Sequence, residues 1–432
     1  MERYVSRHSA AMDDLTTSSD AFVLTGSGAN AAYEVGVLKG LLGGRWGTNG
    51  SAAVTPHCFC GNSVGALNAA IVVSNADLGY EDALRRLESV WLDRIAVDSA
   101  SSVNGIFRIR AEPTQYLNMS QLANPFQPFL QLAADSFHLA RRSVERLAFA
   151  TSSVGAIPDA VVRLSEFNEF VDISPLERLV RETVDTKKIA ASQLGLRITT
   201  LNWSTGAPKT FRNSDFRSGD GHQTIVAALA LPGMVAPQIV NGMAHVDTCV
   251  LMDEPLKPAI LALLENESDL PRVLHVVYVD ATVRDIPLPP LSNTFSTVYR
   301  LYMLALSRAV NADIGRAANL NESIWLKKLL ETVVAADGST EDAENALTTR
   351  LGEESVSVYN RLHRKLEDRK ALTIHRYAPR EHLYGFESIQ FRRDTIAQLI
   401  EHGYEAARNH DCEESRCILP ETTPELERIA SS

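Results

Sequence analysis

Near the start of the chain, short apolar runs alternate with stretches in which apolar residues recur at helical spacing. A short apolar run from Ala21 to Thr25 precedes a glycine-rich turn, after which apolar residues recur at helical spacing from Tyr33 to Leu42. The same order recurs with Cys58-Phe59-Cys60, a tight turn, and the alanine-rich stretch from Ala66 to Val73. Short apolar runs predict buried strands, and a spacing near 3.6 residues predicts helices. The chain therefore begins with two strand–turn–helix units.

The rest of the chain continues this alternation. Further strands are predicted at 196–203, 208–212, 273–279 and 372–377, and further helices at 80–94, 175–184, 222–231 and 392–408. The run at 273–279 is almost uniformly apolar, as expected of a parallel strand that is buried on both faces. Strands that alternate with helices predict an α/β fold with a mainly parallel central sheet flanked by helices in three layers.

Two stretches depart from this pattern and suggest domain limits. Residues 100–165 contain turn-forming breaks and predict a helical insertion, and residues 292–370 predict long helices. The long helices suit homo-oligomerisation or regulation, and equally well suit covering the sheet. The predicted organisation is a loosely ordered N-terminus at 1–19, an α/β domain at 20–290, a helical C-terminal region at 291–411 that packs on it, and a polar tail at 412–432.

Composition narrows the classes of partner. Apolar residues make up 45% and charged residues 22% of the chain, as in ordinary globular proteins. The net charge of −11 argues against nucleic acid, which requires a basic surface. It also argues against charge-driven docking on anionic lipid, so any membrane contact has to be apolar. With no leader pattern and no span-length apolar run, we expect a cytoplasmic protein that meets membranes transiently at their periphery.

The five cysteines predict neither a disulfide framework nor a metal site. Cys58 and Cys60 alternate along one predicted strand and so face the same side, which favours buried thiols in a reducing compartment. Cys412 and Cys417 lack the spacing of a zinc site, and we expect no matching Cys or His pair nearby.

The sharpest local motif is Gly61-Asn62-Ser63-Val64-Gly65, a G-x-S-x-G between a predicted strand and a predicted helix. Such a segment is typical of a nucleophile elbow, in which small residues such as Gly61 and Gly65 permit the tight turn. Ser63 would then project at the positive end of the following helix. A plain glycine-serine turn is the alternative, and the flanking strand and helix favour the elbow.

A second strand-to-helix turn precedes the elbow. Its exposed backbone N–H groups suit an oxyanion hole. The residues concerned are Gly26, Ser27, Gly28 and Ala29. Gly26-x-Gly28-x-x-Ala31 also fits a dinucleotide-binding fingerprint, which requires an acidic residue about 20 positions later. No acidic residue stands between Glu34 and Asp77, so a nucleotide-binding oxidoreductase is the weaker alternative.

A serine nucleophile requires a base. Asp247 follows a short apolar run and precedes a helix that opens at Pro255, which places it in a loop between elements, where catalytic residues concentrate. A histidine triad is the alternative, and the late histidines available for it are His375, His382, His402 and His410. None of these four stands in a recognisable strand-end loop, so Asp247 is the preferred base.

In this order, the motifs resemble the patatin-like phospholipases. The oxyanion segment of that family resembles Gly26 to Val37, its G-x-S-x-G serine falls on Ser63, and the aspartate of its D-G-G or D-G-A motif falls on Asp247. The segment 225–237 resembles the stretch upstream of that aspartate. The likeness covers most of residues 20–280 and one C-terminal helix, including 176–211 and 386–406.

The resemblance implies a lipid acyl hydrolase of the phospholipase A or esterase type. It implies a Ser63–Asp247 catalytic dyad without histidine, a glycine-rich oxyanion hole, a phospholipid or other acyl-ester substrate, and no cofactor or metal. The insertion at 100–165 would then form a lid or acyl-chain pocket, or simply packing helices. Its candidate lipid contacts are Phe126, Phe129, Leu130 and Leu132.

Three departures from the family pattern bear on activity. Asn30 replaces a basic residue, Ala31 replaces a glycine, and Thr248-Cys249 replaces the small residues after the aspartate. Thr248 would be strained if its position required a positive φ. These departures keep a third interpretation open, in which a catalytically degenerate patatin fold serves as a scaffold.

Overall fold

The structure is a computed structural model. It describes residues 18–43, 54–98, 104–109, 171–232, 234–248, 254–266, 270–280, 294–335, 348, 352–366, 369–379 and 391–420. Most of the predicted insertion at 100–165, with its four candidate lipid contacts, lies outside these residues. The division of the chain into domains stays a prediction.

Within the described residues, the centre of the fold is an eight-stranded mixed sheet with the order β10-β9-β1-β2-β5-β8-β7, to which β6 adds by pairing with β5. The strands are β1 (Ser19–Leu24), β2 (Pro56–Gly61), β5 (Gly195–Asn202), β6 (Pro208–Arg212), β7 (Gln238–Val240), β8 (Met243–Val246), β9 (Arg272–Val277) and β10 (Leu372–Tyr377). The first five strands of that order are parallel, whereas β6 and β8 are antiparallel to β5, and β7 is antiparallel to β8. A separate antiparallel pair joins β3 (Arg108–Ile109) to β4 (Val171–Asp172).

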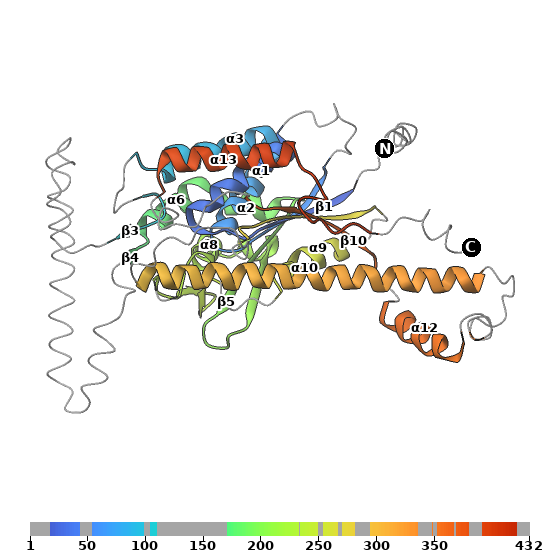
Figure 1. Cartoon of the computed structure of the whole chain (residues 1–432). Coiled ribbons are helices and arrows are strands. Elements are labelled where there is room, and N and C mark those ends of the chain that lie inside the picture. Colours follow the sequence, from blue (N-terminus) through green and yellow to red (C-terminus); the bar gives the residue numbers. More distant parts are fainter. Residues whose placement is uncertain are drawn as a thin grey trace, which may run out of the picture.

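Helices cover both faces of the sheet (Figure 1). One face carries α1 (Ala32–Leu42), α2 (Val64–Ser74), α3 (Tyr80–Ser89), α6 (Ser174–Thr183), α8 (Gly221–Ala228) and α13 (Arg393–Arg408). The other face carries α9 (Lys257–Glu265) and α10 (Thr294–Ala335). The shorter elements are α7 (Thr186–Ala191), α12 (Glu353–Leu366), a π-helix at Val90–Ile95, and 3-10 turns at Gly28–Ala31, Ala76–Leu78 and Asn213–Arg217. The predicted mainly parallel sheet flanked by helices is confirmed.

Side chains alternate between two cores along the central strands. Phe22 and Leu24 of β1 belong to the core beneath α1 and α2, whereas Ala21 and Val23 belong to the core beneath α9 and α10. Cys58 and Cys60 of β2 share the second core, with their sulfur atoms 3.8 Å apart, and both are free thiols. The prediction that these two cysteines are buried on one side of a strand is confirmed.

The C-terminal helix α13 packs directly on α1, as Figure 1 also shows. Glycines allow the two backbones to meet, because a Cβ at Gly36 would lie 1.9 Å from the Ile400 carbonyl oxygen. Likewise, a Cβ at Gly403 would lie 2.1 Å from the Tyr33 carbonyl oxygen. Helix α13 therefore packs closely on the helix that follows the glycine-rich turn.

On the opposite face, the 42-residue helix α10 runs beneath the sheet (Figure 1). Its buried residues Leu306, Val310, Ile314 and Ala317 recur every three or four positions and form one apolar stripe. The Asn321 side chain also bonds both the N–H and the C=O of Leu372, at 3.0 and 2.7 Å, and so satisfies backbone groups of the edge strand β10. Across the described part of the chain, neither α10 nor any other helix is apolar enough over a bilayer-spanning length to cross a membrane.

Candidate active site

Ser63 stands in the two-residue turn between β2 and α2. Its backbone has φ 51° and ψ −137°, a conformation that non-glycine residues rarely adopt and that surrounding structure must impose. The flanking glycines permit this turn, since a Cβ at Gly61 would lie 2.5 Å from the Ala66 Cα. A Cβ at Gly65 would lie 2.3 Å from the Leu24 carbonyl oxygen. The chain is thus folded tightly enough to push Ser63 away from the sheet.

Sheet topology brings Asp247 towards this turn. Strand β6 pairs along one side of β5, so β2 and β8 must share its other side. There β2 ends with Gly61 opposite Ile198, and the antiparallel β8 arrives from the other direction with Val246 opposite Leu201. The ends of β2 and β8 therefore point at each other, separated by only two residues of β5. Ser63 follows one of these ends and Asp247 follows the other.

The protein buries Asp247 almost completely. The residue is 2% exposed. Its backbone N–H donates to the carbonyl of Ala230, which lies just beyond α8, at 2.9 Å. This bond ties the segment after β8 to the segment after α8. The hairpin of β7 and β8 that delivers Asp247 was not predicted, because its strands are short and expose Ile239 and Met243.

The glycine-rich turn presses against Ser63 from the side of β1. Gly26, Ser27 and Gly28 have successive φ values of 79°, 113° and 61°. A Cβ at Gly26 would lie 2.9 Å from both the Ser63 Cβ and the Val64 nitrogen. Such contact leaves room only for glycine, so the turn and the elbow form one rigid unit.

The four residues predicted to form the oxyanion hole differ in whether they line the cavity and in whether their N–H groups are already hydrogen-bonded. The Gly26 N–H donates to a carboxyl oxygen of Glu34 at 2.7 Å and is therefore already hydrogen-bonded within the protein. Ser27 and Gly28 line the cavity beside Ser63, whereas Ala29 is buried and does not line it. Of the predicted amides, the geometry favours those of Ser27 and Gly28, with Val64 as an additional donor at the start of α2.

Glu34 is a site residue that the sequence analysis missed. It lies 2% exposed in the first turn of α1, and Asn68 of α2 donates to its second oxygen at 2.8 Å. Asn68 in turn accepts from the Trp91 indole N–H at 2.8 Å. Burial raises the pKa of Glu34 to about 8, although hydrogen bonds from Gly26, Asn68 and Thr25 act to lower it. This network fixes the glycine-rich turn from below.

A cavity opens above Ser63 and Asp247. Its volume is about 120 Å³. Thr25, Ser27, Ser63 and Asp247 supply polar groups at its base, and most of the remaining lining is apolar. That lining comprises Gly28, Val64, Ile106, Phe107, Val171, Ile173, Leu176, Leu229, Leu231, Met234, Val235, Tyr302, Met303, Leu306 and Phe391. The contribution of α10 was not predicted, and Tyr302 anchors that helix by donating to the Pro232 carbonyl at 2.8 Å.

Comparison with known proteins agrees with this arrangement. The family model for patatin-like phospholipase matches residues 22–260, which is more than half of the chain. The chain belongs to the patatin-like phospholipase family. Its members are lipid acyl hydrolases, and the matched residues include the elbow, the glycine-rich turn and Asp247.

Two further comparisons add little. Among solved structures, the chain is similar to VipD from Legionella pneumophila at 13% identity and a TM-score of 0.29, over 96% of this chain and 74% of that one. A similarity this weak carries no argument. No curated protein matches the chain.

The departures from the family's pattern cause little backbone strain. Ala31 has φ −64° and is right-handed, so no glycine is needed there. Thr248 is 1% exposed and is not among the described residues with positive φ, so the strain expected there is absent. Asn30 is buried, and its N–H donates to the Ser27 carbonyl at 3.2 Å. Cys249 lies outside the described residues.

The histidines considered for a triad lie elsewhere. His375 is in β10, His402 is exposed on α13, and His410 follows α13. None of these three lines the cavity, and His382 is outside the described residues. Among the described residues that line the cavity with Ser63, Asp247 is therefore the one carboxylate, and no histidine, lysine or arginine accompanies it.

Proposed function

We propose that the chain hydrolyses acyl esters of lipids through a Ser63–Asp247 dyad. The observation that carries this proposal is the shared cavity: two strand ends that face each other deliver a strained serine and a buried aspartate to one apolar pocket. Membership of a family of lipid acyl hydrolases supports the same activity. The described cavity lining supplies no histidine for this role.

The reaction follows from these positions. Asp247 accepts the hydroxyl proton of Ser63 while the serine oxygen attacks the ester carbonyl carbon. The negative oxygen of the tetrahedral intermediate accepts hydrogen bonds from backbone N–H groups of the Ser27–Gly28 turn and from Val64, near the positive end of α2. Collapse breaks the ester C–O bond, and the leaving alcohol takes the proton from Asp247. Water then attacks the acyl-serine, gives its proton to Asp247, and the fatty acid leaves as Ser63 recovers its proton.

The apolar lining indicates the substrate class. Side chains such as Phe107, Leu229, Met303 and Phe391 surround the cavity and suit an acyl chain. The described residues that line the cavity include no Lys or Arg to pair with a pyrophosphate, which disfavours the nucleotide-binding alternative. Thr248 lacks the positive φ that would have strained it, which weakens one of the reasons for the scaffold alternative.

Membrane contact, in this proposal, is apolar and transient. The net charge of −11 opposes attraction to anionic lipid. Three large apolar residues are exposed near one another in the sheet: Trp203, directly after β5 (51%), Ile239 of β7 (58%) and Met243 of β8 (47%). Vesicle co-sedimentation should weaken when Trp203 and Met243 are both changed to Ser, while hydrolysis of a soluble ester stays unchanged.

The decisive experiment measures hydrolysis of p-nitrophenyl esters and phospholipid vesicles by wild type, Ser63→Ala and Asp247→Asn. We expect each variant to lose activity by several powers of ten, because the two residues act as one unit. Ser204→Ala, at an exposed turn, is the matched control and should retain full activity. A serine-directed phosphonate should label wild type but not Ser63→Ala. Normal activity in Asp247→Asn would exclude the dyad.

A further inference from the structure

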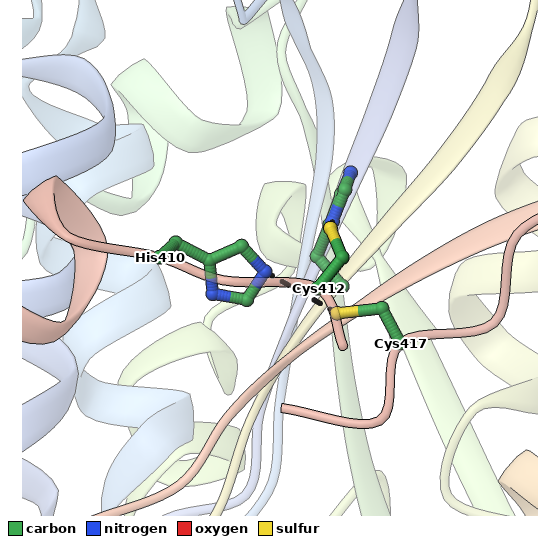
Figure 2. Close-up of side chains that lie close together, drawn as sticks. His410, Cys412 and Cys417 are labelled. Atoms are coloured by element: carbon green, nitrogen blue, oxygen red, sulfur yellow. Dashed lines mark hydrogen bonds between the residues drawn. The ribbon is translucent and has the colours of Figure 1, made fainter. Parts of the chain in front are cut away.

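Four side chains with metal-binding atoms meet beside β10, away from the catalytic cavity. His375 lies within β10, and His410, Cys412 and Cys417 lie in the segment after α13. Their ligand atoms all fall within 4.8 Å of one another. His410 Nε2 is 3.2 Å from the Cys417 sulfur, and His375 Nδ1 is 3.5 Å from the Cys412 sulfur. Figure 2 shows the His410 ring directed at Cys417, with Cys412 beside them.

This cluster corrects the sequence analysis, which expected no His or Cys pair near Cys412 and Cys417. The fold supplies the pair because the C-terminal segment returns to the sheet edge. Ile374 and Ile418 exchange two backbone hydrogen bonds of 2.8 and 2.9 Å. That bridge sets the segment alongside His375, which the sequence separates from it by the whole of α13.

The local backbone shapes a compact loop for the two cysteines. The Cys417 N–H donates to the Cys412 carbonyl at 2.9 Å, and Arg416 takes φ 53° to close the turn. The N–H of Arg376, next to His375, points at the Cys417 sulfur at 3.4 Å. Backbone N–H groups directed at sulfur stabilise a thiolate and orient it, as outer-shell partners of metal ligands do.

The chemistry of the donors selects the ion. Two thiols and two imidazoles form the donor set of structural zinc sites. With Zn–S near 2.3 Å and Zn–N near 2.0–2.1 Å, tetrahedral ligand atoms stand about 3.3–3.8 Å apart. The His410–Cys417 and His375–Cys412 nitrogen–sulfur distances, 3.2 and 3.5 Å, are close to that range. Small side-chain rotations would complete the geometry.

We propose that His375, His410, Cys412 and Cys417 bind one Zn²⁺ in a closed tetrahedral site. Four protein ligands leave no position for water or substrate, so the ion is structural. It clamps the segment after α13 to the edge strand β10. Helix α13 packs through Gly403 on α1. The zinc ion therefore also helps to hold α13 in place on α1, on the face of the sheet that carries the glycine-rich turn.

The first test is the metal content of the full chain, purified reduced, without chelator and with any polyhistidine tag removed. We expect about one zinc ion per chain by inductively coupled plasma mass spectrometry. Replacement by Co²⁺ should give the intense visible absorption of a tetrahedral site together with sulfur-to-cobalt charge transfer. Zinc removal should lower the melting temperature, and zinc return should restore it, because metal binding adds to folding free energy.

Variants locate the site. Cys417→Ser and His410→Ala should weaken zinc binding by more than about 100-fold, since even outer-shell changes cost 10–100-fold. His402→Ala, an exposed histidine on α13, is the matched control and should bind zinc like wild type. Wild-type protein with reduced thiols that neither retains zinc nor takes up Co²⁺ would overturn the proposal. A Cys412–Cys417 disulfide in freshly isolated protein, or zinc retained by Cys417→Ser, would overturn it equally.

Discussion

Gly26 packs so closely on Ser63 that a Cβ at Gly26 would stand 2.9 Å from the Ser63 Cβ. The same Gly26 has φ 79° and gives its N–H to buried Glu34. The glycine-rich turn is therefore held on two sides, by the nucleophile turn and by α1. Its amides keep a fixed position relative to Ser63 before substrate arrives, which is the requirement for stabilising an oxyanion.

Gly26→Ala should consequently impair catalysis more than folding. The new methyl group must displace the elbow backbone, and a displacement near 1 Å costs about 100-fold in rate. Gly206→Ala is the control, because Gly206 has a similar φ of 70° but nothing within 4 Å of its added Cβ. Both variants should lose about 1 kcal/mol of stability from positive φ, and Gly26→Ala should lose roughly a further 1–3 kcal/mol because its methyl group overpacks the elbow. Equal ester hydrolysis by the two variants would show that the contact with Ser63 is unimportant.

Met303→Trp tests the acyl-chain cavity. Met303 is 4% exposed and reaches the cavity from α10, so a larger side chain should shorten the space available to an acyl chain. Since each buried methylene contributes about 0.8 kcal/mol, kcat/KM for long-chain esters should fall at least about tenfold. Acetate and butyrate esters should be hydrolysed nearly as by wild type.

The control for this substitution is Leu301→Trp, on the same helix at 63% exposure. It should leave the chain-length profile unchanged. If Met303→Trp reduced short-chain and long-chain hydrolysis by the same factor, the cavity would not be the acyl-chain site.

Glu34→Gln tests the buried carboxyl under the glycine-rich turn. Burial raises the pKa of Glu34 from 4.5 to about 8, so the folded protein holds a proton that the unfolded chain releases. Stability from this group is complete below about pH 4.5 and is lost as the pH rises through about 8. The free energy of unfolding of wild type, relative to Glu34→Gln, should decline by up to about 1.4 kcal/mol per pH unit in that window.

Urea unfolding at a series of pH values measures this slope. Glu401→Gln, an exposed change on α13, controls for the loss of one carboxylate from the surface. Parallel pH profiles for wild type and Glu34→Gln would mean that Glu34 titrates alike in the folded and unfolded chains.

The sequence alone was sufficient to predict a site residue where the residues that shape its turn are close to it in the chain. Ser63 stands in a strand–turn–helix motif that is visible in the local sequence, although only Gly61 is required by a nearby residue, Ala66, whereas Gly65 is required by its contact with Leu24 of β1. Asp247 came from the order of family motifs, since β8 is a four-residue strand with too little periodicity to predict. Met303 and Phe391 reach the cavity from distant elements, and nothing in their local sequence indicates it. His375 and Cys412 likewise meet only because Ile374 of β10 pairs with Ile418 in the segment after α13.

Gly403→Ala tests whether the contact between α13 and α1 supports the site. Its added methyl would lie 2.1 Å from the Tyr33 carbonyl oxygen, a backbone atom that cannot rotate away. The helices must separate, and overpacking of this kind costs about 1–3 kcal/mol. Separation also shifts α1, which carries Glu34 one residue after Tyr33, so ester hydrolysis should fall in protein that is still folded.

Gly315→Ala provides the matched control, because Gly315 lies in α10 with nothing within 4 Å of its added Cβ. Replacing a glycine in an open helical position should stabilise the protein by about 0.5–1 kcal/mol and leave activity unchanged. The two alanine variants therefore differ only in what the new methyl group meets. A Gly403→Ala protein with wild-type melting temperature and activity would mean that the close packing of α13 on α1 does not support the glycine-rich turn.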